Sequence, residues 1–269
     1  MRLEVKNTVF QQGRPQVAVS ITGETVTGII EQAKAIALEP VQVIEWRADY
    51  YLAAFEDIGE ALKSADTYLE IMNILEGISQ GAPELPLIFT IRTKGQGGQI
   101  ELANEQIEGI QAFVADSSLV DFIDVEVKGY KKQFGGIGGK RLEDRIAKIH
   151  EKNKKVILSY HDFEEMIPSK DIAKLVAFMA KNGGDMFKVA AMANSDADAK
   201  EMLEATAFLN KKGIGPLITM AMGNAGAITR IIGGKYGSVI TFAAVGDTSA
   251  PGQISAERMK TELDRFYGA

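Results

Sequence analysis

The sequence predicts a (βα)8 barrel on the basis of three observations. Eight short apolar runs recur along the 269 residues, each long enough for one strand. The runs are continuous rather than alternating, which is typical of parallel strands covered on both faces. Longer stretches with apolar residues at helical spacing separate them. Eight strand–helix units in this length fit a closed barrel better than an open sheet, and we expect a single domain over residues 1–269.

The predicted strands follow one another along the chain with a helical segment after each. They cover residues 16–21, 41–48, 85–92, 120–127, 155–162, 186–193, 217–223 and 238–245. Parallel strands need such a crossover connection, because each new strand must start at the same end of the sheet as the last.

Four of the intervening segments have clear helix signals. Residues 24–39 place apolar side chains at helical spacing. Residues 168–184 begin with Pro, offer Ser169 as a candidate N-cap and end in Gly-Gly. Residues 195–213 open with acidic residues and close with Lys-Lys-Gly, which suits the helix dipole. The last helix is expected over residues 255–268.

The first residues belong to none of these units. The stretch RLEVKNTVFQQG, residues 2–13, alternates like a strand and has no apolar segment typical of a signal peptide. We expect a short N-terminal β-hairpin that closes the bottom of the barrel.

The composition restricts the classes of protein that are expected. The net charge is −6, with no basic stretch typical of nucleic-acid or acidic-membrane binding. The absence of cysteine excludes disulfides, thiolate nucleophiles and iron–sulfur clusters. With only His150 and His161, no multi-histidine metal site is expected. No apolar run reaches membrane-spanning length, so we expect a cytoplasmic protein without a membrane partner.

Polar side chains gather at the carboxyl ends of the predicted strands, where a barrel of this kind carries its chemistry. They are Ser20; Glu45, Arg47 and Asp49; Arg92; Asp124, Glu126 and Lys128; His161 and Asp162; Lys188; Ser249 and Gln253; and Arg230 on the helix after the seventh strand. Met220 and Met222 are most simply barrel packing. Asp124, Glu126 and Lys128 are predicted to form a structural salt-bridge network rather than a metal site, since no histidine accompanies them.

Lys188 is the least ordinary of these residues, because it interrupts an apolar run. Facing the barrel interior, it would be buried near other cations, and both conditions favour the neutral amine. A neutral amine attacks a carbonyl and forms a Schiff base, which needs a general acid or base nearby. His161 is the strand-end histidine available for that role. The residues alone therefore indicate a Schiff-base lyase acting on a small anionic keto compound, with the carbonyl on the substrate rather than on a cofactor.

Longer motifs surround these residues. They are EWRAD (45–49), FTIRT (89–93), SYHDF (159–163), FKVAAMA (187–193), TMAMG (219–223), ITRIIGGKYGS (228–238), TFAAV (241–245) and SAPGQ (249–253). Together they resemble the type I 3-dehydroquinate dehydratases, in the order and spacing of that family and over nearly the whole chain. The resemblance implies a (βα)8 barrel, which agrees with the strand count, and a lyase of the shikimate pathway of aromatic amino acid biosynthesis.

The resemblance also implies a role for each site residue. Lys188 forms the Schiff base with the C3 ketone of 3-dehydroquinate, and His161 serves as general base and then acid in a syn elimination to 3-dehydroshikimate. The implied substrate-binding residues are Arg230 as the main carboxylate anchor, Ser249 and Gln253 on a closing loop, Glu45, Arg47 and Arg92 on the hydroxyl side, and Ser20 at the floor. The implied walls are Phe163, Met220, Met222 and Phe242. No cofactor is implied, and the family is typically a homodimer.

One position departs from the pattern R-x-x-x-E-G-G that many members have after the third strand. Here RTKGQGG places Gln96 where those members have glutamate. The family glutamate supports the catalytic histidine, and a neutral amide stabilises an imidazolium less well. We therefore expect Gln96 to orient His161, and the pKa of His161 to be lower than in glutamate-bearing relatives, with activity retained.

Two alternatives remain open. A class I aldolase-like Schiff-base lyase shares the lysine and the barrel, but it usually needs a phosphate site. The stretch GGIGGK, residues 135–140, lacks the Gly-Lys-Ser/Thr ending of a phosphate loop, and we interpret it as a mobile turn before a helix. The second alternative is a catalytically weakened homologue that binds dehydroquinate, and its one support is Gln96.

Overall fold

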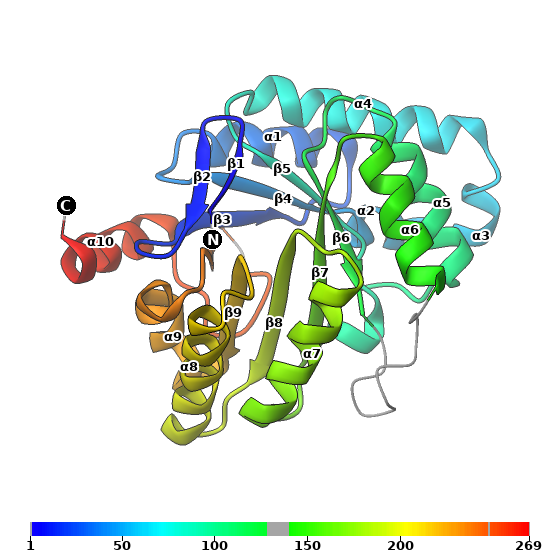
Figure 1. The fold of residues 1–269 in the computed structure, drawn as a ribbon. Coiled ribbons are helices and arrows are strands. Elements are labelled where there is room, and N and C mark those ends of the chain that lie inside the picture. Colours follow the sequence, from blue (N-terminus) through cyan, green and yellow to red (C-terminus); the bar gives the residue numbers. More distant parts are fainter. Residues whose placement is uncertain (1, 128–139, 247, 269) are drawn as a thin grey trace.

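Eight parallel strands form the centre of the molecule in a computed structural model, which describes residues 2–127, 140–246 and 248–268 (Figure 1). The strands are β3 (Gln16–Ile21), β4 (Val43–Arg47), β5 (Leu87–Thr90), β6 (Phe122–Glu126), β7 (Lys155–Asp162), β8 (Met186–Met192), β9 (Leu217–Met222) and β10 (Ile240–Ala243). Their order is β10-β3-β4-β5-β6-β7-β8-β9. A parallel bridge from Leu217 to Ser238 joins β9 to the segment before β10, so the barrel closes. The predicted (βα)8 barrel is confirmed.

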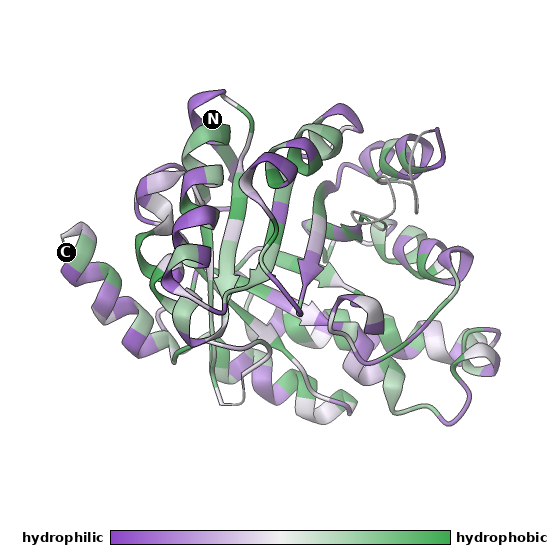
Figure 2. Cartoon of the chain, turned by 90° about the horizontal axis from the view of Figure 1, so that it is seen from below, coloured by the Kyte–Doolittle hydropathy of each residue, from purple (hydrophilic) through white to green (hydrophobic). Residues whose placement is uncertain are grey.

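Helices surround the strands and cover the outside of the barrel (Figure 1). They are α1 (Val26–Ile36), α2 (Ala48–Ala53), α3 (Ile58–Ala61), α4 (Ala65–Gly81), the 3₁₀ turn η1 (Lys94–Gln96), α5 (Asn104–Ala115), α6 (Lys140–Glu151), α7 (Ser169–Lys181), α8 (Asp196–Lys211), α9 (Gly223–Tyr236) and α10 (Ala256–Tyr267). Figure 2 shows hydrophilic and hydrophobic stripes on these helices and mostly hydrophobic strands. Such stripes pack against a covered sheet.

Side chains alternate between the two faces of each strand, and this alternation produces two cores. On β8, Phe187, Val189 and Ala191 belong to the core between the barrel and the helices. Met186 and Ala190 belong to the core inside the barrel. Lys188 lies between these two inward positions, so the same alternation directs it into the barrel.

The N-terminal hairpin consists of β1 (Arg2–Val5) and β2 (Thr8–Gln11). Phe10 is fully buried and meets the ring of Phe122 edge-on, with ring centroids 5.7 Å apart. It packs in the interior core with residues from the starts of the strands. The hairpin therefore closes the bottom of the barrel, as predicted.

The main departures from the predicted elements are local. β4, β5, β6 and β10 are shorter than the apolar runs that predicted them. The predicted N-cap at Ser169 is wrong: Pro168 occupies that position, and the Ser169 N–H donates instead to Glu201 Oε1, 2.6 Å away on the next helix. Lys128 and residues 135–139 of the GGIGGK stretch lie outside the described residues.

No helix among the described segments has the length and apolar character needed to cross a membrane.

Candidate active site

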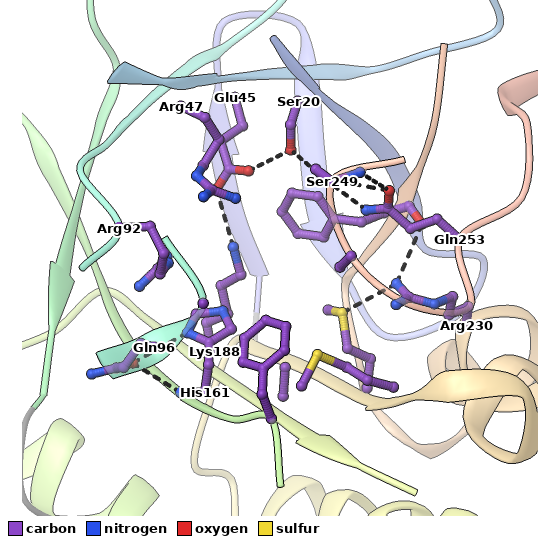
Figure 3. A pocket seen from close by; sticks show the side chains of 17 residues that line it. Ser20, Glu45, Arg47, Arg92, Gln96, His161, Lys188, Arg230, Ser249 and Gln253 are labelled. Carbon is purple, nitrogen blue, oxygen red and sulfur yellow. Dashed lines mark hydrogen bonds and ion pairs between the residues drawn. The ribbon is translucent and has the colours of Figure 1, made fainter. Parts of the chain in front are cut away.

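A cavity opens at the carboxyl ends of the strands, and every residue predicted for the site lines it (Figure 3). The lining residues are Ser20, Glu45, Arg47, Arg92, Gln96, Gly97, His161, Phe163, Lys188, Ala190, Met220, Met222, Arg230, Phe242, Ser249, Ala250 and Gln253. They come from six of the eight strands and from the segments that follow them. The barrel thus gathers residues that are up to 233 positions apart, from Ser20 to Gln253, around one small volume.

Lys188 is buried in this cavity and has a carboxylate partner. Its Nζ donates to Glu45 Oε1 at 3.1 Å and lies 4.2 Å from the centroid of the Phe242 ring. Both contacts stabilise a positive charge. The sequence predicted a buried amine near other cations, and the structure adds a carboxylate that β4 brings across the barrel to it.

Glu45 is held as an anion by several donors. It accepts hydrogen bonds from Ser20 Oγ at 2.6 Å and from Thr90 Oγ1 at 3.0 Å. Burial disfavours its charge, yet the neighbouring charges of Lys188 and Arg47 lower its pKa to about 2. Glu45 is consequently a fixed negative charge and hydrogen-bond acceptor at neutral pH rather than a proton carrier.

Gln96 holds His161 by two contacts. Its Oε1 accepts from the His161 backbone N–H at 2.9 Å and lies 3.2 Å from His161 Nδ1, while its Nε2 donates to the Val127 carbonyl oxygen at 3.1 Å. A backbone N–H can only donate and a carbonyl oxygen can only accept, so the orientation of the amide is determined. Nδ1 must then carry the hydrogen, and Nε2 keeps its lone pair.

The imidazole of His161 is neutral and stacks against the ring of Phe163. Burial, and then the charges of Arg92 and Lys188, lower the pKa of His161 well below its ordinary value of 6.5. The Phe163 ring stacks on it with centroids 6.4 Å apart. The principal cause of this lowering is burial, and the expected difference from glutamate-bearing relatives stays a prediction.

Arg92 and Arg47 are each neutralised by carboxylates of the protein. Arg92 donates to Asp124 Oδ1 at 3.0 Å and to Glu126 Oε1 at 2.9 Å. Asp124 and Glu126 thus belong to a salt-bridge network, whereas Lys128, the third predicted member, lies outside the described residues. Burial opposes the charge of Arg92, but these two anions raise its pKa. Arg47 forms a two-pronged pair with Asp49, with both N–O distances 2.7 Å.

Arg230 lies on the opposite side of the cavity from Gln96 and His161 (Figure 3) and has no carboxylate within pairing distance among the described residues. Its Nη2 donates to the Pro251 carbonyl oxygen at 3.0 Å, and its buried Nε has no hydrogen-bond partner. Burial lowers its pKa to about 10. A buried cation without a counter-ion is costly, so the cavity is suited to a ligand that brings a carboxylate.

The loop after β10 covers this side of the cavity. Ser249 N–H donates to Gln253 Oε1 at 2.8 Å, and Ser249 Oγ lies 3.3 Å from Ser20 Oγ. The loop therefore touches both Ser20 and, through Pro251, Arg230. Among the described residues, no group of three acidic, histidine or cysteine side chains is arranged to hold a metal ion.

Comparison with known proteins agrees with this geometry. Residues 17–268 match the family described as type I 3-dehydroquinase. The chain belongs to that family. Among its relatives is the 3-dehydroquinate dehydratase of Listeria monocytogenes serotype 4b, 32% identical over 266 residues that cover 99% of this chain and 98% of the relative. The Klebsiella pneumoniae (strain ATCC 700721 / MGH 78578) protein of the same name is 33% identical over 261 residues, or 97% and 96% of the two chains.

Solved structures of the family have the same fold. The type I 3-dehydroquinate dehydratase of Clostridium difficile superposes with a TM-score of 0.85 at 30% identity, covering 99% of this chain and 98% of that one. The Geobacillus kaustophilus 3-dehydroquinate dehydratase gives 0.87 at 28% identity, covering 100% and 98%.

Three lining residues of this family member were missed by sequence reasoning. Ala190 follows Lys188 by two positions on β8, so strand alternation could have found it. Ala250 lies inside the SAPGQ motif, between predicted residues. Gly97 has φ +85°, and an added Cβ would lie 2.2 Å from the Phe163 ring. The glycine pair after Gln96 was the available signal for that close approach.

Proposed function

We propose that this chain is a lyase that dehydrates 3-dehydroquinate to 3-dehydroshikimate in the shikimate pathway of aromatic amino acid biosynthesis. One observation carries the proposal: the same cavity contains a buried lysine and a neutral histidine whose Nε2 is unprotonated. Family membership supports it, and the solved C. difficile relative contains covalently modified comenic acid.

In the proposed reaction, Lys188 attacks the C3 ketone and forms an imine with loss of one water. The amine must first give up a proton. Glu45, with a pKa of about 2, cannot retain it, whereas His161 Nε2 can accept it. His161 then gives this proton to the former ketone oxygen, which leaves as water, so Nε2 is unprotonated again when the imine has formed. The imine then draws electrons from C2, and His161 removes a C2 proton to give an enamine.

Collapse of the enamine completes the elimination. The electron pair returns to form the C1–C2 double bond, the C1 hydroxyl leaves, and the proton on His161 Nε2 leaves with it as water. Hydrolysis of the imine consumes one water and restores Lys188. The net change is the loss of one water from the substrate, with no cofactor required by the balance.

The other lining residues bind and orient the ring in this proposal. Arg230 pairs with the substrate carboxylate, and Ser249 and Gln253 close over it. Glu45, Arg47, Arg92 and Ser20 hold the hydroxyl side, while Phe163, Met220, Met222 and Phe242 form apolar walls. The support for this division is that Arg230 lacks a counter-ion among the described residues whereas Arg47 and Arg92 already have carboxylates.

Borohydride added during turnover of 3-dehydroquinate tests the role of Lys188. Reduction of the imine should leave an adduct that mass spectrometry locates on Lys188. Lys188→Met should give no adduct, and Lys155→Met, at the partly exposed start of β7, should give the parental adduct. An adduct on another residue, or none, overturns the proposal.

A second test addresses His161. We expect His161→Ala to slow formation of the conjugated enone by at least about a hundredfold, because the general base is removed. Ultraviolet absorbance of the enone provides the measurement. Retained turnover would remove His161 from the assigned role and leave the lysine assignment intact.

We also propose that the chain is one domain that acts as a homodimer in the cytoplasm. The family resemblance supports the dimer, and a biosynthetic role supports the compartment. Size-exclusion chromatography with light scattering tests the dimer, and a monomer at micromolar concentration would contradict it.

A further inference from the structure

A second cavity lies outside the barrel, between α5 and α6, and has a volume of about 160 Å³. Its walls include Ala112 and Ile149, and charged side chains such as Glu108 and Lys148 lie around it. None of its lining residues belongs to the candidate active site. An engineered apolar cavity of roughly 150 Å³ in another protein binds benzene, so this volume suits one small ring.

Arg145 lines this cavity and is 4% exposed. Its Nε and Nη2 both donate to Gln111 Oε1, a neutral acceptor, with the Nε contact at 3.0 Å. No carboxylate lies within 4.0 Å of its guanidinium in the part of the chain that the structure describes. Burial lowers the pKa of Arg145 to about 10, against the partial compensation of the more distant Glu108. The charge is thus buried without an ion pair.

The buried arginines of this protein differ in whether a carboxylate neutralises them. Four arginines are buried among the described residues, and Arg47 and Arg92 have carboxylates within 3.0 Å. The other two, Arg230 and Arg145, have none and rely on neutral acceptors. All four line one of the two cavities, so the missing counter-ion is what distinguishes Arg230 and Arg145: a structural arginine is normally neutralised by its own protein.

The neighbours of Arg145 cannot supply the missing charge. Gln111 is held in place because its Nε2 donates to the Asp124 carbonyl oxygen at 2.8 Å, so its Oε1 is the atom that faces Arg145. Glu108 pairs with Lys148 at 3.3 Å and lies 3.8 Å from Arg141. Arg145 Nη1 makes no hydrogen bond within the described residues and remains a free donor.

We propose that the cavity between α5 and α6 is a second binding site, for a small organic acid that places its carboxylate on Arg145 and a compact ring or branched body against Ala112 and Ile149. A carboxylate there would accept charge-assisted hydrogen bonds from the guanidinium. The apolar walls would exclude water from the remainder of the ligand.

Benzoate is the probe, and calorimetry on the full chain is the measurement. We expect benzoate to bind, with a dissociation constant that rises about tenfold or more in Arg145→Met. Methionine is an apolar replacement of similar length, and replacing a buried charge in this way is often tolerated. Ala112→Met provides a second variant that fills the cavity and leaves Arg145 in place. Lys260→Met is the matched control, because that exposed lysine on α10 pairs with Asp264, lies outside this cavity, and its loss should change the constant less than threefold.

Arg230→Gln separates this site from the active-site cavity, which also contains an unpaired guanidinium. The second site requires that benzoate bind Arg230→Gln as tightly as the parent. Loss of binding in that variant would place benzoate in the barrel cavity and overturn the second site without touching the proposed dehydration. Absence of binding, or binding unchanged in both Arg145→Met and Ala112→Met, would also overturn it.

Discussion

Gln96 determines which nitrogen of His161 can act as a base. Its amide is oriented by the backbone N–H of His161 and the carbonyl of Val127, so it accepts from Nδ1 and leaves Nε2 unprotonated. A glutamate would keep this acceptor and add a negative charge, which stabilises the imidazolium. The neutral amide therefore favours an imidazole that stays unprotonated to lower pH.

This charge difference predicts the effect of Gln96→Glu on the pH profile. The base works only when His161 is neutral, so kcat/KM falls as the pH falls through the pKa of His161. In the parent that acidic limb should lie below pH 6.5, because the pKa is lowered. Gln96→Glu should move the limb upward by about one pH unit. A profile of kcat/KM against pH is the measurement.

Gln96→Ala is the control for that shift. It removes the orienting contact and adds no charge, so it should lower kcat without moving the limb upward. A parental limb at or above pH 6.5, or a downward shift in Gln96→Glu, would contradict the account.

The chemistry of Lys188 and His161 was predictable from sequence because each interrupts or ends an apolar run. The ion pair between Lys188 and Glu45 was not, since its partners are 143 residues apart and meet only across the closed barrel. The run pattern identifies which face of a strand a residue occupies, but it does not identify which residue of another strand faces it. Arg145 was missed for a related reason, because a charged residue on a helix usually faces solvent.

At the scale of elements, the turn after β5 supports His161 through the Phe163 ring. Gly97 allows the Phe163 ring to lie directly against the backbone, and Phe163 in turn stacks on His161. Gly98 is equally confined, because an added Cβ would lie 1.8 Å from the Arg92 carbonyl oxygen. The two glycines therefore let one short turn support both His161 and Arg92.

Gly97→Ala should disturb this arrangement. Its Cβ would clash with the Phe163 ring, and φ +85° is unfavourable for any residue with a side chain. We expect the free energy of unfolding to fall by about 1–2 kcal/mol and kcat to fall by roughly tenfold as His161 shifts. Urea unfolding and steady-state kinetics give the two quantities.

Gly95→Ala is a matched control in the same turn. The nearest atom to its added Cβ is 3.9 Å away, and its φ is not in the left-handed region. Its stability and kcat should stay close to those of the parent. Equal effects of the two substitutions would show that the Phe163 contact is not the cause.

Element boundaries were the weakest part of the sequence prediction. β3 and β7 match their apolar runs from end to end, because polar residues or turns follow at once. β10 occupies only Ile240–Ala243 of the run 238–245. The cap of α7 was mispredicted because Glu201, the residue that binds its first N–H, belongs to α8. Local sequence cannot specify a contact supplied by another helix.

At the scale of the whole molecule, the hairpin and the site occupy opposite ends of the barrel. Phe10 packs among residues at the starts of the strands, whereas Lys188 and His161 face the cavity at their carboxyl ends. A substitution in the hairpin should therefore change the free energy of unfolding without changing kcat.

Phe10→Ala should lower the free energy of unfolding by about 3–5 kcal/mol, because a fully buried ring and its contact with Phe122 are lost. The kcat of the folded protein should remain within about twofold of the parent, since no site residue moves. Val9→Ala, on the less buried face of the same strand, should cost less. A large loss of kcat in Phe10→Ala at a temperature where it is folded would contradict this separation.

The position of the hairpin also determines how molecules pass through the barrel. With the N-terminal end filled by Phe10 and its neighbours, the route to Lys188 runs past the loop of Ser249 and Gln253. Substrate, eliminated water and enone product must all use that passage in turn. Because Lys188 forms one imine at a time in the proposed reaction, the product has to be released from it before another substrate can react. The hairpin, remote from the chemistry, thereby leaves one end of the barrel for both arrival and departure.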